Sequence, residues 1–208
     1  MIQAQKTDSK AYWMASLNDS ERRKAIQNLT EEEASLILYE WKFWARESQL
    51  PPKGKWRYWL CKAGRGWGKT RSGSEYIRQR VIDGAMRIAL VGRTSADVRD
   101  VMVEGRSGLL AVFPPNQRPV YEPSKRRITF HTGAVATTYS ADEPEMLRGP
   151  EHDTAWADEL CAWRFPDAWD QLQFGLRVGD DPKAIITTTP KPSRLIRDLL
   201  KHPHCVVT

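Results

Sequence analysis

The stretch that decides the fold is Trp56-Arg57-Tyr58-Trp59-Leu60-Cys61-Lys62-Ala63-Gly64-Arg65-Gly66-Trp67-Gly68-Lys69-Thr70. Its apolar first part predicts a β-strand over Trp56–Cys61, and the residues from Lys69 to Ile82 predict a helix. The glycines between them permit unusual φ/ψ angles, so that backbone N–H groups can face an anion at the positive end of the helix. Strand, glycine-rich loop and helix in this order predict a phosphate-binding P-loop (Walker A). The alternative is a glycine-rich β-turn that happens to precede a lysine.

Within this loop, Lys69 is predicted to bridge the β- and γ-phosphates of a nucleotide, and the Thr70 hydroxyl to ligate Mg²⁺. One position departs from the strict motif, because Ala63 stands where a glycine is required. An alanine can serve there if its φ is negative. The residues predicted to bind the nucleotide are Ala63, Gly64, Arg65, Gly66, Trp67, Gly68, Lys69, Thr70 and Arg71.

Composition adds weaker information. The 208 residues are 40% hydrophobic and carry a net charge of +6, which suits one substantial core and favours a polyanionic partner. The only compact basic cluster, Lys125-Arg126-Arg127, is either a nucleic-acid contact or a solvated turn. The sequence has no long apolar span and no signal peptide, so a cytosolic protein is expected. Cys61, Cys161 and Cys205 are expected to be reduced core thiols.

The pattern along the chain predicts an α/β protein. A helical segment over residues 1–47 is expected to pack on a P-loop core over 48–208. Asn18 or Asp19 is predicted to cap its helix over Glu21–Ile26, and Thr30 with Glu33 to cap a second one over Ala34–Trp44. In the core, short apolar runs alternate with amphipathic stretches, which indicates helices around a mostly parallel sheet. The predicted strands are Trp56–Cys61, Arg87–Val91, Ala134–Tyr139, Asp153–Ala157, Ala184–Thr188 and Cys205–Thr208, and the helices are Lys69–Ile82, Ala96–Glu104, Pro166–Phe174 and Ser193–Leu200.

A pair of carboxylates follows the strand Asp153–Ala157, as in a Walker B motif. Asp158 is predicted to hold Mg²⁺ and Glu159 to polarise the attacking water, at the end of a strand beside the P-loop strand. The alternative is that Asp158 caps the following turn and Glu159 is only solvent-exposed. Thr187, Thr188 and Thr189 end another strand, where their hydroxyls can contact the γ-phosphate or the carboxylate pair and couple hydrolysis to motion; threonine is also a common strand residue.

The order Gly64–Thr70, Asp158-Glu159 and Thr187-Thr188-Thr189-Pro190 resembles the ATPase domain of the large terminase subunit of tailed bacteriophages. In that family the first P-loop glycine is often replaced and an arginine lies inside the loop. The resemblance implies a three-layer P-loop NTPase of the ASCE type that uses ATP and Mg²⁺ to drive double-stranded DNA into a procapsid in the host cytoplasm. It also implies a ring of subunits, a pentamer, that works with a portal protein and a small terminase subunit.

The resemblance further implies roles for single residues. Arg148 is a candidate arginine finger for the γ-phosphate of a neighbouring subunit, with an exposed salt bridge as the alternative, and Arg65 is a candidate phosphate sensor in cis. Gln49 is a candidate adenine contact, or simply a polar loop residue. No segment after the Thr187 strand is long enough for the family's nuclease domain, so nuclease activity is not expected, and the chain is expected to be part of a longer protein.

Two other functions fit a P-loop with an acidic pair. One is a helicase or other nucleic-acid-stimulated ATPase, although helicases normally need a second motor domain. The other is a non-catalytic nucleotide switch that controls assembly. Arg164, Arg177 and the cluster Lys125-Arg126-Arg127 are candidate DNA contacts, or solvated charges.

Overall fold

The structure is a computed structural model that describes residues 9–208. The chain divides into two compact units, Met1–Pro51 and Pro52–Thr208. The first eight residues of the predicted helical segment lie outside the described residues. The domain boundary between residues 47 and 48 stays a prediction, as does the packing of that segment on the core.

The first unit contains the helices α1 (Lys10–Ser16), α2 (Asp19–Gln27), α3 (Glu31–Leu38) and α4 (Trp41–Trp44), followed by the 3₁₀ turn η1 (Glu47–Gln49). Asn18 caps α2 and Thr30 caps α3, each in a capping box closed by a glutamate three residues on. The single helix predicted over Ala34–Trp44 is wrong. Glu40 is extended at φ −86° and ψ 91°, and its carboxylate accepts from Lys42 N at 3.1 Å, so it starts a new helix.

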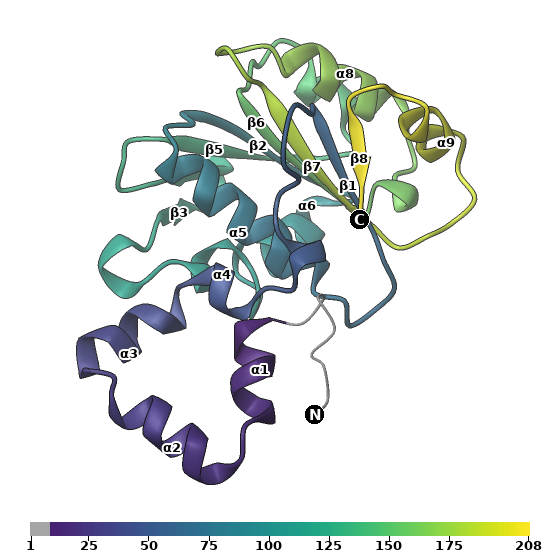
Figure 1. The fold of residues 1–208 in the computed structure, drawn as a ribbon. Helices are drawn as coiled ribbons and strands as arrows, with labels where there is room; N and C mark the ends of the chain where they lie inside the picture. The colour runs from purple at the N-terminus through teal and green to yellow at the C-terminus, as the bar shows by residue number, and fades with distance from the viewer. Residues whose placement is uncertain (1–8) are drawn as a thin grey trace. The chain divides into compact units, whose positions relative to one another are not determined.

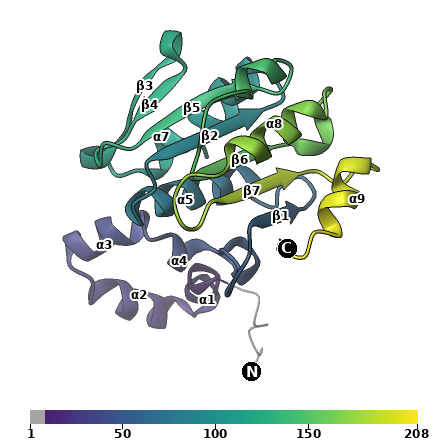
Figure 2. The same ribbon diagram turned by 90° about the horizontal axis from the view of Figure 1, so that it is seen from above.

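The second unit is built on one sheet. Among the described residues eight strands pair in the order β3-β4-β5-β2-β6-β7-β1-β8 (Figures 1 and 2). The hairpin strands β3 and β4 run antiparallel, and the other strands are parallel to one another. The strands are β1 (Tyr58–Lys62), β2 (Arg87–Gly92), β3 (Val120–Glu122), β4 (Arg127–Thr129), β5 (Val135–Ser140), β6 (Thr154–Asp158), β7 (Lys183–Thr188) and β8 (Cys205–Val207).

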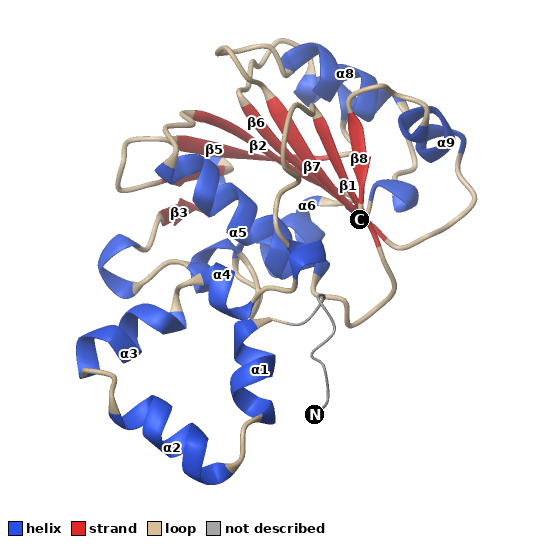
Figure 3. Cartoon of the chain, in the orientation of Figure 1, coloured by secondary structure: helices blue, strands red, loops and turns tan. Residues whose placement is uncertain are grey.

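Helices cover both faces of this sheet, as Figure 3 shows. On one face, α5 (Lys69–Ile82) buries Tyr76, Ile77 and Val81 against the strands. On the other face, α8 (Asp167–Gly175) and α9 (Arg194–Leu200) bury a second cluster. These layers confirm the predicted fold class, a three-layer α/β protein with a mostly parallel sheet. Within the described residues no helix is long and apolar enough to cross a membrane.

The helix predicted over Ala96–Glu104 exists in a different form. It begins as α6 (Ser95–Asp97) and continues as a π-helical turn, η2 (Val98–Val103). Its apolar residues, with those of α7 (Leu109–Val112), join the cluster under α5. The remaining short turns are η3 (Pro115–Gln117), η4 (Pro123–Lys125), η5 (Pro144–Leu147) and η6 (Leu160–Ala162).

The strand order corrects one expectation about the site. The strand that carries Asp158 does not lie beside the P-loop strand, because β7 pairs with both β6 and β1. Asp158 is in register with Thr187, and Lys62 with Thr188. The threonine strand therefore lies between the P-loop and the carboxylate pair. The cysteines are free thiols: Cys61 is buried in the core, and Cys161 and Cys205 are half-buried and pack against the second core cluster.

Candidate active site

The loop from Ala63 to Gly68 joins the end of β1 to the start of α5. Gly66 and Gly68 have φ of 78° and 93°, a conformation that side chains with a Cβ rarely adopt. Among the described residues only Arg126 and Glu159 combine a positive φ with a side chain, so Ala63 is not in this region. Alanine therefore fits the backbone at the position where the strict motif has glycine.

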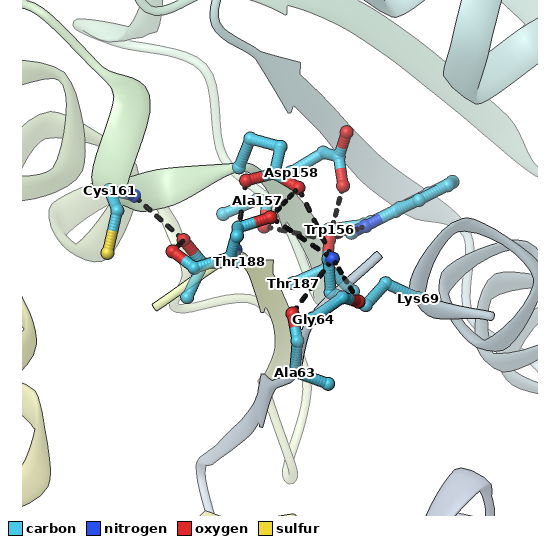
Figure 4. Close-up of polar contacts among 11 residues, drawn as sticks. Ala63, Gly64, Lys69, Trp156, Ala157, Asp158, Cys161, Thr187 and Thr188 are labelled. Carbon is cyan, nitrogen blue, oxygen red and sulfur yellow. Dashed lines mark hydrogen bonds and ion pairs between the residues drawn. The ribbon is translucent and has the colours of Figure 1, made fainter. Parts of the chain in front are cut away.

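Lys69, the first residue of α5, turns its side chain back into the loop (Figure 4). Its ammonium donates to Ala63 O at 3.0 Å, Gly64 O at 3.1 Å and Thr189 Oγ1 at 3.2 Å. The residue is only 9% exposed. The loop thus holds a buried cation at its centre, at the N-terminus of a helix whose first turn has no acidic residue.

Asp158 ends β6 and is buried on the side of the sheet that faces α5. Thr187 Oγ1 donates to Asp158 Oδ1 at 2.5 Å, and the indole Nε1 of Trp156 donates to the same hydroxyl at 2.8 Å (Figure 4). Because the hydroxyl accepts from the indole, its own hydrogen is directed to the carboxylate. Burial raises the pKa of Asp158 to about 6, although the Thr187 hydrogen bond lowers it. The Thr187 hydroxyl therefore holds the Asp158 carboxylate in one orientation.

Glu159 has a left-handed backbone, with φ 49° and ψ 46°. This turns its side chain toward the end of β7, where its carboxylate accepts from Thr189 N and Thr189 Oγ1, both at 2.9 Å. The same carboxylate lies 3.6 Å from the Lys69 ammonium. Thr189 thus contacts both Glu159 and Lys69, and its hydroxyl joins the predicted base to the P-loop.

Trp156 also fixes the distance between the P-loop helix and the sheet. Its ring is fully buried and lies directly against Gly73 of α5, where an added Cβ would be only 2.2 Å from Trp156 Cε2. At this point the helix that carries Lys69 therefore contributes no side chain of its own, and its backbone packs directly on the Trp156 ring.

An open pocket of ≈ 470 Å³ lies over the loop. One wall is formed by the P-loop, the start of α5 and Glu159, and the other by residues of the π-helical turn η2 and of the segment that follows it. Ser74 of α5 ties the two walls together, since its hydroxyl donates to Ser107 O at 2.9 Å. The lining residues are Gly64, Gly66, Gly68, Lys69, Thr70, Arg71, Asp100, Val101, Gly105, Arg106, Ser107 and Glu159.

The second wall was missed by the sequence analysis. Arg106 brings an exposed cation to the pocket, between Gly105 and Ser107. The Gly105–Gly108 run of small residues around Arg106, directly after a predicted helix, is a signal for a tight loop that could have identified it.

The residues present fit a magnesium ion. Mg²⁺ prefers oxygen ligands and typically takes one or two from the protein, with phosphate and water completing its shell. The Asp158 carboxylate and the Thr70 hydroxyl are such ligands, and a nearby cation would offset the burial of the Asp158 charge. Within residues 9–208 no group of three or more His, Cys, Asp or Glu side chains gathers as a metal site.

Four predicted site residues lie outside this hydrogen-bond network. Arg148 follows η5, with its side chain 72% exposed and 3.6 Å from Glu145, and neither it nor the exposed Arg65 lines the pocket. Gln49 is buried in the first unit, where its side chain accepts from Arg46 N at 3.1 Å. Thr188 is buried and accepts from Cys161 N at 3.0 Å, which anchors the turn after Glu159.

The candidate DNA contacts are mostly paired with acids. Lys125 and Arg126 lie at the predicted hairpin turn between β3 and β4, and Arg127 begins β4. Lys125 pairs with Glu122, Arg126 with Glu143 at 2.9 Å, and Arg177 with Glu151 at 2.8 Å. Arg164 lies over the ring of Phe165.

Comparison with known proteins identifies the family. The model of the family described as the terminase large subunit, T4likevirus-type, N-terminal, matches residues 60–206, from the P-loop strand to the last strand. The chain belongs to this family. None of the curated proteins compared with this terminase chain matches it.

Solved structures share the fold. The ATPase domain of the large terminase of Thermus phage P74-26 superposes with a TM-score of 0.62 at 14% identity, covering 86% of this chain and 84% of that one. The large terminase of a thermophilic bacteriophage, solved in complex with ADP, gives 0.61 at 17% identity, covering 84% of this chain and 44% of that one. The large terminase of bacteriophage HK97 gives 0.58 at 18% identity, covering 86% and 39%. This terminase chain spans less than half of the length of the last two proteins.

Proposed function

We propose that this chain is the ATP-hydrolysing motor domain of a phage DNA-packaging terminase. The observation that carries the proposal is the convergence of Lys69, Asp158 and Glu159 at the carboxyl ends of β1 and β6, where Thr187 and Thr189, at the end of the intervening β7, contact them. Family membership supports it, as does the large terminase of the thermophilic bacteriophage, whose structures include complexes with ADP and ATP-gamma-S.

The P-loop binds the phosphates of ATP. Backbone N–H groups from Gly64 to Thr70 and the dipole of α5 stabilise the negative charge, and Lys69 exchanges its contacts with the loop carbonyls for phosphate oxygens. Bound Mg²⁺, held by Thr70 and Asp158, would neutralise part of the phosphate charge. Thr187 and Trp156 keep the Asp158 carboxylate oriented for this contact.

Glu159 accepts the proton of the attacking water. In the structure Thr189 holds this carboxylate through two hydrogen bonds, next to Lys69. A phosphate that draws Lys69 and the Thr189 hydroxyl toward itself frees one oxygen of Glu159 to accept a proton. Thr189 thus links the occupancy of the P-loop to the base and, through β7, to the rest of the sheet. The two preceding threonines anchor neighbouring segments, since Thr187 contacts Asp158 and Thr188 contacts Cys161.

The motor acts as a ring, expected to be a pentamer, on a portal protein in the host cytoplasm, with a small terminase subunit and double-stranded DNA as partners. The wide exposure of Arg148 supports its role as a finger offered to a neighbouring subunit, since its Glu145 ion pair is weak at the surface. Arg65 is the corresponding sensor in cis, and Gln49 the adenine contact.

The decisive experiment compares Glu159→Gln with Lys69→Ala. Glu159→Gln should bind ATP as tightly as the parent but hydrolyse it about 10²- to 10⁴-fold more slowly, because it cannot accept the proton. Lys69→Ala should lose tight ATP binding. Glu32→Gln, an exposed carboxylate on α3, is the matched control and should leave both quantities unchanged. Multiple turnovers by the parent exclude a non-catalytic switch, and normal turnover by Glu159→Gln would show that the base is another group.

A further inference from the structure

A buried carboxylate on the P-loop helix has no part in the mechanism above. Glu75 lies one helical turn after Arg71 and its side chain is only 2% exposed. Two arginines contact the Glu75 carboxylate. Arg71 Nε and Nη2 lie 2.9 Å and 2.7 Å from Oε1, and Arg78 Nη1 lies 3.3 Å from Oε2. Burial raises the pKa of Glu75, while the charges of Arg71 and Arg78 lower it. One buried acid thus holds two arginines in fixed positions.

The Arg71–Glu75 pair is poorly suited to stabilising the helix. In an isolated helix an acid–base pair is most favourable with the acid on the N-terminal side, where it also meets the positive end of the dipole. Glu75 and Arg78 have that order, but in the Arg71–Glu75 pair the cation comes first, and the first turn of α5 contains Lys69 and Arg71 but no acid. Burying an ion pair also costs desolvation energy that its attraction often does not recover. The pair therefore calls for a reason other than stability.

That reason lies in the pocket. Arg71 lines it together with Lys69 and Thr70, whereas Arg78 does not and instead lies 5.9 Å from the centre of the Phe113 ring. The Arg71 side chain keeps 29% of its surface exposed, although its Nε and Nη2 are bonded to Glu75. The carboxylate therefore fixes the side chain of a first-turn residue that lines the pocket, at the end of the helix where a P-loop collects phosphate charge.

We propose that Glu75 is a positioning residue that holds Arg71 as a preorganised phosphate-binding cation at the wall of the nucleotide pocket. The inference rests on the proposed function and adds a second fixed cation beside Lys69. A guanidinium that is already oriented loses little side-chain entropy when phosphate binds. A buried carboxylate holds the guanidinium in this orientation more firmly than a solvated carboxylate would.

The test is the affinity of the whole chain for a fluorescent ATP analogue and for inorganic tripolyphosphate as its competitor. Arg71→Ala should weaken the binding of both about 10- to 100-fold, the usual effect of losing a charge-assisted hydrogen bond. Glu75→Gln should weaken both about 3- to 10-fold, because Arg71 remains but is no longer held. Arg71→Lys keeps the charge without the two-pronged contact to Glu75 and should resemble Glu75→Gln. Arg78→Ala, which breaks the other half of the cluster, is the matched control and should bind as the parent does, even if its melting temperature falls.

The double variant Arg71→Ala with Glu75→Gln separates positioning from a structural effect. If Glu75 acts through Arg71, adding Glu75→Gln to Arg71→Ala weakens phosphate binding no further. Additive losses, an equal loss in Arg78→Ala, or a loss for ATP without a loss for tripolyphosphate would each overturn the inference. If the parent binds ATP, Lys69→Ala does not, and Arg71→Ala binds normally, this inference fails while the proposed function stands. If the parent itself binds no ATP, the proposed function fails.

Discussion

Replacement of Gly73 by alanine tests how closely the P-loop helix is packed on the sheet. The new Cβ would lie 2.2 Å from Trp156 Cε2 and 2.4 Å from Cζ2, whereas carbon atoms in contact are about 3.5–4.0 Å apart. The indole is fully buried, so it must move by more than about 1 Å, or α5 must. Overpacking of this kind costs about 1–3 kcal/mol, and the gain from alanine in a helix returns only about 0.5–1 kcal/mol.

The net loss of about 1–2 kcal/mol should lower the melting temperature by about 2–8 °C in a chain of this size. Urea and thermal unfolding followed by circular dichroism measure it. Gly64→Ala is the matched control, because nothing lies within 4 Å of its added Cβ and its φ is not left-handed. Trp156→Phe should recover part of the loss in the Gly73→Ala background, since the smaller ring vacates the space. A Gly73→Ala variant as stable as the parent, or more stable, would refute the packing argument.

Three further predictions concern the charged groups. The pKa of Asp158 is raised from 3.8 to about 6, so its effect on stability is favourable below pH 3.8 and is lost as the pH rises through 6. Asp158→Asn should therefore raise the free energy of unfolding by about 3 kcal/mol at pH 8 and by much less at pH 4, as urea titrations would measure. Thr189→Ala releases Glu159 and should leave ATP affinity within about threefold while changing kcat, and an unchanged kcat in steady-state assays would contradict the coupling role. Arg148→Ala should abolish the stimulation of ATPase activity on assembly and leave ATP binding intact, and loss of binding would show that it acts within its own pocket.

Local sequence signals were enough to predict most of the helices and strands of the second unit. Helix α5 begins and ends at the predicted Lys69 and Ile82, because the loop glycines and the apolar spacing are both local signals. The break before α4 was missed because Glu40 can cap a helix as well as continue one, and tertiary context decided between the two. The hairpin strands β3 and β4 are too short for a period of two to be recognised.

The sequence predicted the P-loop, the Asp158-Glu159 pair and the threonines as one candidate site, with threonine hydroxyls near the carboxylates, but not which threonine contacts which carboxylate. The pairing of Asp158 with Thr187 follows from the register of β6 and β7, and an order of strands cannot be read from one sequence. Arg106 and the clamp on Arg71 depend on which loop and which helix face meet in space, and these contacts are set by the packing of the fold. The roles assigned to Arg148, Arg65 and Gln49 stay predictions.

The left-handed backbone at Glu159 lowers the stability of the fold, although the proposed reaction needs a carboxylate at this position. A side chain in this conformation costs about 1 kcal/mol or more relative to glycine, and the neighbouring Asp158 carries a buried charge. A library selected only for heat resistance would therefore be expected to replace both carboxylates, for example by glycine at Glu159 and asparagine at Asp158. If the proposed function is right, such a selection would yield a more stable protein without ATPase activity, so directed evolution of this domain would need an activity screen in every round.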